Sequence, residues 1–242
     1  MNIKVTMKKD CRKFKAGEVI EVPLREGAVN FMVGGNGCGK STFSHFIRAT
    51  RHTLKEYNTK INEGMTNNDD RLFSRDTGVF DIEGLEVFDD IFVLDAIDDD
   101  PLSFDRAISA TAFVTNGAFE MTNMSKGERA SSLFVRFLKN IERMLGVNAK
   151  DPDSIKNNTK HSLIILDEVE EGMSLEIQKT FYELMCIFAQ KLNATVLCIS
   201  HNPMVAMCSG TTDVVVYDME RRSETVLKDY IYDKLGFWVD ID

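Results

Sequence analysis

The run Val29-Asn-Phe-Met-Val33-Gly-Gly-Asn-Gly-Cys-Gly-Lys-Ser-Thr42 is the most informative part of this sequence. It begins with a mostly apolar, β-prone run, continues into a glycine-rich loop and then opens a segment with apolar residues at helical spacing. Gly34, Gly39, Lys40 and Ser41 fit the spacing G-x-x-x-x-G-K-[ST]. Glycines let successive backbone N–H groups turn toward phosphate oxygens, and the N-terminal dipole of a helix favours the same anion. The stretch predicts a phosphate-binding loop.

This loop is assigned as a whole to nucleotide binding, and its residues are Gly34, Gly35, Asn36, Gly37, Cys38, Gly39, Lys40, Ser41 and Thr42. Lys40 is expected to reach the β- and γ-phosphates, and the Ser41 hydroxyl to ligate a Mg²⁺ that bridges them. The alternative is a glycine-rich turn with an incidental lysine. The flanking strand and helix patterns favour the phosphate loop.

The size and composition of the chain suit one α/β domain. The chain has 242 residues, of which 43% are hydrophobic, enough for a packed core. It contains no apolar run of the ~20 residues that cross a bilayer, and no apolar block follows the lysines near the N-terminus. The five cysteines form no C-x-x-C pair, so reduced thiols are expected. We therefore expect a cytoplasmic protein.

The charge of the chain is strongly acidic. The net charge is −9, and aspartates concentrate between residues 89 and 105. Such a surface repels a polyanion unless a basic patch lies elsewhere. Nucleic acid stays an alternative partner that the net charge disfavours, and the acidic segment itself is typical of a solvated loop.

Alternating apolar residues predict several strands around the phosphate loop. The expected strands cover residues 3–7, 19–24, 79–82, 85–88 and 91–94, and the first two form a β layer before the phosphate-loop strand. Residues 58–77 are rich in Asn, Asp, Gly and Thr and predict a loop.

Leu163-Ile-Ile-Leu-Asp-Glu168 is a second informative stretch. A strand this apolar suits the interior of a parallel sheet, and its acids would then lie at the carboxyl end, where such sheets bind ligands. Asp167 is expected to hold Mg²⁺, and Glu168 to act as general base on the attacking water. The alternative is a strand that merely ends in a polar turn.

His201 follows another predicted strand, residues 195–200, which comes after a helix beginning near Leu175. One helix and one strand therefore separate the histidine from Glu168. If the two strands are neighbours in a parallel sheet, His201 lies beside the γ-phosphate as a second catalytic residue. The alternative is a capping or turn histidine.

Ser125-Lys-Gly-Glu128 precedes a helix with apolar residues from Leu133 to Leu145. Ser125 is a good N-cap and Glu128 completes a capping box, which by itself explains both residues.

Taken in order, these motifs resemble those of an ABC-type ATPase, over nearly the whole chain. Gly34 to Ser41 is similar to Walker A and Leu163 to Glu168 to Walker B. Ser125 to Glu128 is similar to the signature, with Lys126 where glycine is usual, and Glu171-Gly-Met-Ser174 and Ile199-Ser-His-Asn202 are similar to the D-loop and the switch-histidine segment. The resemblance implies a P-loop NTPase of the α/β class, with a mostly parallel central sheet and an N-terminal antiparallel β layer. Residues 1–242 would form a single ATP-binding domain, with a helical signature lobe at about 96–145.

The resemblance also implies ligands and partners. ATP and Mg²⁺ would be sandwiched in a head-to-tail homodimer, with Ser125 and Gly127 binding the γ-phosphate in trans. Phe14 precedes Lys40 by about the interval at which the family carries an aromatic that stacks on adenine, although a core phenylalanine is an equal alternative. The family's glutamine between Walker A and signature is missing, because the chain's glutamines are Gln178 and Gln190. Asp95 is the candidate stand-in.

The spacing of the motifs bears on the branch of the family. The interval from Ser41 to Ser125 is too short for the long coiled-coil arm of chromosome-maintenance relatives. The chain looks closest to the small soluble ABC ATPases of bacteria and their viruses, whose partners are diverse. We expect this chain to couple hydrolysis to an unknown partner protein and to reach a membrane only through a partner. The alternatives are a transporter's ATP-binding subunit and a DNA-associated ATPase or nucleotide switch.

Overall fold

The computed structural model describes residues 1–51, 78–95, 159–170, 173–203 and 214–236, together with Glu128, Val135, Lys139 and Ala206. The strands are β1 (Asn2–Met7), β2 (Val19–Pro23), β3 (Val29–Val33), β4 (Phe80–Glu83), β5 (Asp90–Asp95), β6 (Ser162–Asp167), β7 (Ala194–Ile199), β8 (Val215–Asp218) and β9 (Ser223–Val226). The helices are α1 (Lys40–Arg51), α9 (Leu175–Lys191) and α11 (Leu227–Leu235).

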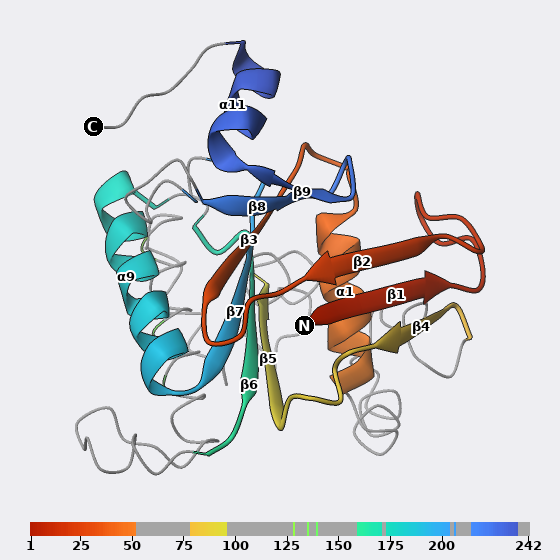
Figure 1. Ribbon diagram of the computed structural model, residues 1–242, viewed down its shortest axis with the longest axis horizontal. Helices are drawn as coiled ribbons and strands as arrows, with labels where there is room; N and C mark the ends of the chain where they lie inside the picture. Colours follow the sequence, from red (N-terminus) through yellow and green to blue (C-terminus); the bar gives the residue numbers. More distant parts are fainter. Residues whose placement is uncertain are drawn as a thin grey trace, which may run out of the picture.

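Two sheets form the scaffold (Figure 1). The larger has the order β5-β6-β7-β3-β8-β9 and the smaller the order β2-β1-β4. The neighbouring strands from β5 to β8 pair in parallel, and β9 pairs antiparallel to β8. The smaller sheet is antiparallel throughout. The predicted P-loop NTPase fold, with a mostly parallel central sheet and an N-terminal antiparallel layer, is confirmed.

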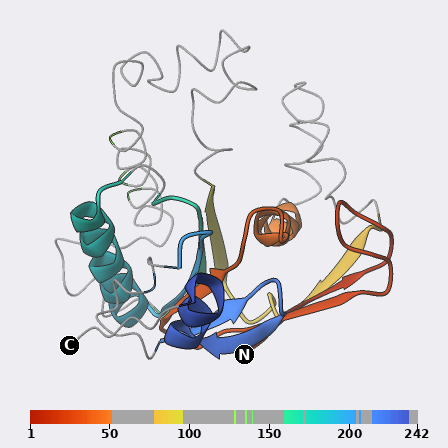
Figure 2. The same cartoon turned by 90° about the horizontal axis from the view of Figure 1, so that it is seen from above.

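The large sheet separates two apolar cores. Helix α9 lies on one side, and α1 lies on the other, between the large sheet and the antiparallel layer (Figures 1 and 2). Along β6 the side chains alternate between the cores, with Leu163 and Ile165 toward α1 and Ile164 and Leu166 toward α9. All six residues of β6 and all six of β7 are buried. These strands are apolar throughout because both of their faces are covered.

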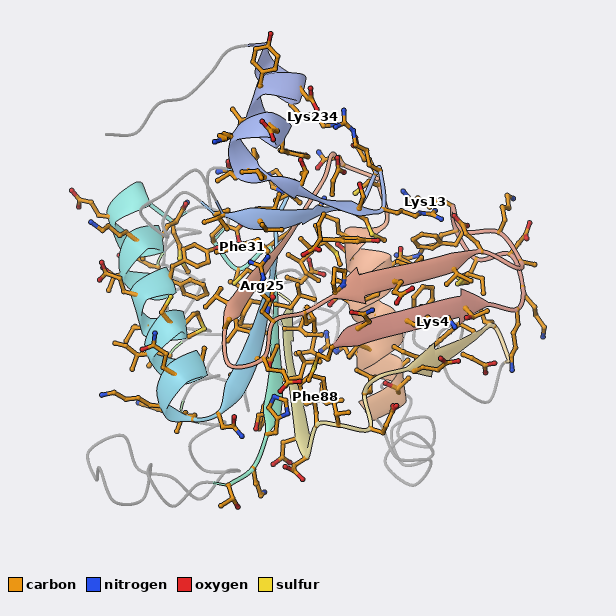
Figure 3. All side chains as sticks on the ribbon, viewed as in Figure 1. Lys4, Lys13, Arg25, Phe31, Phe88 and Lys234 are labelled. Carbon is orange, nitrogen blue, oxygen red and sulfur yellow. The ribbon has the colours of Figure 1, made fainter. Side chains whose placement is uncertain are left out.

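Aromatic side chains pack on both faces of the large sheet, from α1 on one face and from α9 on the other. Phe43, Phe46 and Ile47 on α1 are fully buried, as their helical spacing predicted. On the opposite side, the Phe31 ring of β3 packs against Tyr182 of α9 with the ring centroids 5.7 Å apart (Figure 3). The phosphate-loop strand is therefore held from both sides.

Two elements differ from the sequence-based expectation. Residues 85–88 are not a strand, since they form a turn between β4 and β5 whose Leu85 and Phe88 side chains are buried. Their apolar pattern reflects contact with the core rather than strand pairing. Strand β9 was not predicted, because Ser223-Glu-Thr-Val226 is short and mostly polar.

The strand order places the site. Strand β7 lies between β6 and β3, and all three run in parallel, so their carboxyl ends meet at one edge of the sheet. The phosphate loop follows β3, Asp167 ends β6 and Glu168 comes directly after it, and His201 follows β7. In the part of the chain that the structure describes, no helix is long and apolar enough to cross a bilayer.

Candidate functional site

The phosphate loop connects β3 to α1 and wraps around its own lysine. Lys40 is 3% exposed, and its Nζ donates to the carbonyl oxygens of Gly34 at 2.8 Å and Gly35 at 3.2 Å. The ammonium group is thus held by two carbonyl dipoles inside the loop. A phosphate oxygen is a stronger, charged acceptor that can take their place.

A cavity of about 310 Å³ opens at this loop. It is lined by residues of the phosphate loop and α1, by the loop after β1 and by the end of β6, namely Arg12, Lys13, Asn36, Gly37, Gly39, Lys40, Ser41, Thr42 and Glu168. Gly37, Gly39 and Glu168 have positive φ angles of 75°, 101° and 53°. The cavity therefore combines cationic side chains, turned backbone and one carboxylate.

The two predicted acids lie at the carboxyl end of β6. Asp167 is 2% exposed and aligns in register with Ile199 of β7. Glu168 follows it, and its N–H donates to the Ile199 carbonyl at 2.9 Å. A left-handed conformation is unusual for glutamate, and it is held here by the neighbouring strand. The chain turns at Glu168, whose side chain lines the cavity.

His201 meets Glu168 at this edge. The His201 Nδ1 lies 3.4 Å from Glu168 Oε1, although a helix and a strand separate the two residues in sequence. The His201 side chain is 40% exposed and that of Glu168 is 17% exposed. The predicted pair is thus brought together by β6 and β7, and it lies beside the cavity of the phosphate loop.

Phe14 is a correction to the sequence-based assignment. Its side chain is fully buried and packs against Phe46, with ring centroids 6.0 Å apart. The Arg222 guanidinium and the Lys13 ammonium lie 5.7 and 5.6 Å from the Phe14 ring centroid. A ring enclosed in this way has no face open to a base. Of the two alternatives, Phe14 is therefore a core residue, and its ring packs against the phosphate loop at Gly39.

The predicted signature residues Ser125 and Gly127 and most of the predicted helical lobe at 96–145 lie outside the described residues. For Asp95 only the backbone is described, and it pairs in register with Asp167 at the end of β5. The backbone of Asp95 therefore lies beside that of Asp167.

Sequence reasoning missed several residues at the site. Arg12 and Lys13 line the cavity from the loop between β1 and β2, and Arg12 Nη1 lies 3.4 Å from Thr42 Oγ1. A local run of basic residues was visible, but nothing in it indicated that this loop returns to the phosphate loop. Lys13 is labelled in Figure 3.

Glu220 is another missed residue, on the turn between β8 and β9. Its carboxylate accepts the Gly35 N–H at 2.8 Å and forms an ion pair with Lys234 of α11. The bond to Lys234, followed by that to Gly35, lowers the pKa of Glu220. The C-terminal hairpin and helix are thus tied to the start of the phosphate loop, which lies near the other end of the chain.

The residues present fit a Mg²⁺ site of the kind that uses few protein ligands. Among the described residues, no group of three or more His, Cys, Asp or Glu gathers around one point. Mg²⁺ commonly takes one or two protein oxygens and completes its shell with phosphate oxygens and water. Ser41 lines the cavity, and Asp167 directly precedes Glu168, which also lines it. Both supply the hard oxygen donors that this ion prefers.

Comparison with known proteins places the chain in a family. Residues 50–207 match the family described as "AAA domain, putative AbiEii toxin, Type IV TA system". The chain belongs to this family. It is an ABC-type ATPase nucleotide-binding domain, as its motifs indicated. The match begins after Lys40, so the phosphate loop is an observation independent of it.

This ABC-type domain is also similar to solved ATP-binding cassettes. One is a nucleotide-free cassette from an ABC transporter, with 14% identity and a TM-score of 0.48, covering 98% of this chain and 96% of that one. Another is a dimeric cassette in a post-hydrolysis state bound to ADP and Pi, with 14% identity and a TM-score of 0.44, covering 94% of this chain and 99% of that one. No curated protein matches the sequence.

Proposed function

We propose that this chain is a Mg²⁺-dependent ATP hydrolase that works as a head-to-tail homodimer and drives a partner protein. The observation that carries the proposal is the contact of 3.4 Å between Glu168 and His201, beside the cavity formed by the Lys40 loop. A phosphate cradle and a carboxylate–imidazole pair at the same sheet edge are what hydrolysis of a γ-phosphate requires.

Each residue has a role in this proposal. Lys40 exchanges the Gly34 and Gly35 carbonyls for phosphate oxygens, and Glu168 accepts a proton from the attacking water. His201 keeps the Glu168 carboxylate oriented and lies toward the γ-phosphate. Ser41 and Asp167 would hold Mg²⁺, which would neutralise charge on the phosphate oxygens when bound.

The dimer is inferred from the signature-like segment. The sequence of Ser125 to Glu128 predicts an N-cap, and a helix that starts there would present N–H groups and a positive dipole end suited to the γ-phosphate of a second copy. Residues 1–242 then act as one domain, with the lobe at 96–145 presenting Ser125 and Gly127 to the partner copy. Two ATP molecules would lie in the interface.

A test of the dimer uses Glu168→Gln, which keeps the shape of the side chain and removes the base. We expect ATP–Mg²⁺ to produce a stable dimer of this variant, measured by light scattering after size exclusion, with turnover reduced by about a hundredfold or more. Glu183→Gln, an exposed position on α9, is the matched control and should behave as wild type. A Glu168→Gln chain that stays monomeric at saturating ATP–Mg²⁺ contradicts the sandwich.

A second test separates binding from catalysis. Lys40→Ala removes the cation that contacts the β- and γ-phosphates, so ATP affinity should fall while the fold is kept. Equilibrium binding of a fluorescent ATP analogue measures the change. Unchanged affinity would remove the phosphate-loop assignment.

The partner and the location complete the proposal. In the described part of the chain, Cys11, Cys38, Cys186 and Cys198 are thiols rather than halves of a disulfide, which is consistent with a reducing compartment and with the proposed cytoplasmic location. Affinity purification from the native cell would distinguish a permease from nucleic acid or another protein, and salt-sensitive retention of DNA would indicate the DNA-associated alternative.

A further inference from the structure

A buried carboxyl group, that of Glu170, lies close to both Glu168 and His201. Glu170 is 4% exposed, and its Oε1 accepts a hydrogen bond from the Ser200 hydroxyl. Ser200 is 1% exposed, and its Oγ in turn accepts the Asn202 N–H at 2.9 Å. The contact joins the segment after β6 to the segment after β7.

The position of this contact along the chain is informative. Glu170 is the second residue after Glu168, and Ser200 directly precedes His201. The Glu168 N–H also donates to the Ile199 carbonyl at 2.9 Å. The two bonds therefore join the same two segments that the Glu168–His201 contact joins.

Burial of Glu170 needs an explanation, because glutamate is rarely buried and loses hydration when it is. The titratable groups that face it are Glu168 and His201, and the buried Cys198 thiol is also close. Burial raises the pKa of Glu170, and the Ser200 hydrogen bond opposes that rise. The hydrogen bond from the Ser200 hydroxyl offsets part of the cost of burying this carboxyl group.

His201 depends on such support. Its side chain is 40% exposed, so packing alone leaves the ring with rotational freedom. Ser200 directly precedes the histidine, and the N–H of Asn202, which follows it, is bonded to the Ser200 Oγ that Glu170 anchors. A shift of this anchor would move the ring relative to Glu168.

We propose that Glu170 is a positioning residue for hydrolysis, which acts through Ser200 to hold His201 at Glu168. The proposal rests on the function proposed above. It differs from a purely structural role because it assigns the effect of Glu170 to the orientation of one side chain in the reacting state. Nucleotide binding by the phosphate loop should not depend on it.

The test measures kcat, KM and equilibrium ATP affinity in single and double variants. Glu170→Ala and Ser200→Ala should each lower kcat by about ten- to a hundredfold, the range expected for a catalytic group displaced by up to about 1 Å. KM and ATP affinity should stay within about threefold of wild type. Glu170→Gln should retain most of the activity, because its amide oxygen still accepts the Ser200 hydroxyl.

A double-variant comparison identifies the route of the effect. In a His201→Ala background, Glu170→Ala should lower kcat by less than about twofold, because the side chain that it positions is gone. Ser162→Ala is the matched control, since Ser162 is equally buried and lies at the opposite end of β6. Ser200→Ala removes one oxygen only and keeps the test valid if Glu170→Ala fails to fold.

The outcomes separate the two proposals. If His201→Ala slows turnover but Glu170→Ala and Ser200→Ala do not, the positioning role is wrong and the proposed function stands. Equal losses in the wild-type and His201→Ala backgrounds, or losses confined to ATP affinity, also overturn it. If neither Glu168→Gln nor His201→Ala slows turnover, the proposed function fails, and the positioning role fails with it.

Discussion

Gly39→Ala is the most direct test of how the core supports the phosphate loop. Gly39 has a φ of 101°, and a Cβ added there would lie 2.4 Å from Cζ of Phe14 and 2.8 Å from Cε of Lys13. The Lys13 side chain can move, but Phe14 is fully buried against Phe46. Phe46 in turn packs on Phe80 with ring centroids 4.5 Å apart. The added methyl group therefore clashes with the Phe14 ring, which has no free space to move into.

The cost has two parts. A left-handed backbone with a Cβ costs about 1–2 kcal/mol, and overpacking a filled core costs about 1–3 kcal/mol. Gly39→Ala should thus lower the free energy of unfolding by about 2–5 kcal/mol, a large share of the roughly 5–15 kcal/mol of a typical domain. Gly37→Ala is the control, because Gly37 also has a positive φ, 75°, but an added Cβ meets nothing within 4 Å. Its cost should be the backbone part alone.

Urea denaturation of both variants measures the difference, which should be about 1–3 kcal/mol. A second comparison adds Phe14→Leu, which makes room for the methyl group. Phe14→Leu should cost less in the Gly39→Ala background than in wild type. Equal destabilisation by Gly37→Ala and Gly39→Ala, with additive effects of Phe14→Leu, would refute the role of Phe14 as the support of the loop.

The contacts around the site support three further predictions. Lys234→Ala leaves the Glu220 carboxylate without its ion-pair partner near the triphosphate, so ATP affinity should fall by up to about fivefold, as for a surface pair worth at most about 1 kcal/mol. Adding Glu220→Gln should restore it in a fluorescence titration, and a double variant weaker than Lys234→Ala would contradict this. The pKa of Glu170 is raised by burial, so its carboxyl group binds a proton more tightly in the folded chain than in the unfolded chain, where the ordinary pKa is 4.5. The stability gained from this tighter proton binding is fully present below pH 4.5 and is lost as the pH rises through the higher pKa of the folded chain. Over that pH range, Glu170→Gln should therefore become more stable relative to wild type, as measured by urea titrations. A difference independent of pH would argue against a proton on Glu170. Removal of Mg²⁺ with EDTA should stop ATP turnover, measured by phosphate release, until Mg²⁺ is returned. Equal turnover in EDTA would exclude the roles assigned to Ser41 and Asp167.

Much of the scaffold could be predicted from local patterns. Strand β3 and the buried face of α1 agree with the apolar periodicity, and β6 and β7 have the continuous apolar runs of strands covered on both faces. Residues 85–88 show the limit of this reasoning. Burial of Leu85 and Phe88 gives the alternation of a strand, but the backbone turns after Gly84, whose φ is 89°. Periodicity reports which side chains are buried and not whether the backbone pairs.

Phe14 shows why the role of a site residue can stay open at the level of sequence. Its place upstream of Lys40 suits an adenine-stacking aromatic as well as a core side chain. Enclosure by Phe46, Lys13 and Arg222 decides between them, and Arg222 comes from the far end of the chain. No local pattern contains that information.

The sequence by itself determined the phosphate loop, because the conformation of that loop depends on glycines, a lysine and a helix start within one short run of the chain. It also placed Asp167, Glu168 and His201 at the ends of buried strands. Which groups meet at these strand ends became clear from the folded chain alone. The contacts of Glu168 with His201, Glu170 with Ser200 and Gly35 with Glu220 all join residues that are distant in sequence. Such contacts depend on the order β6-β7-β3-β8, which is set by the packing of whole strands and helices rather than by any short stretch of sequence.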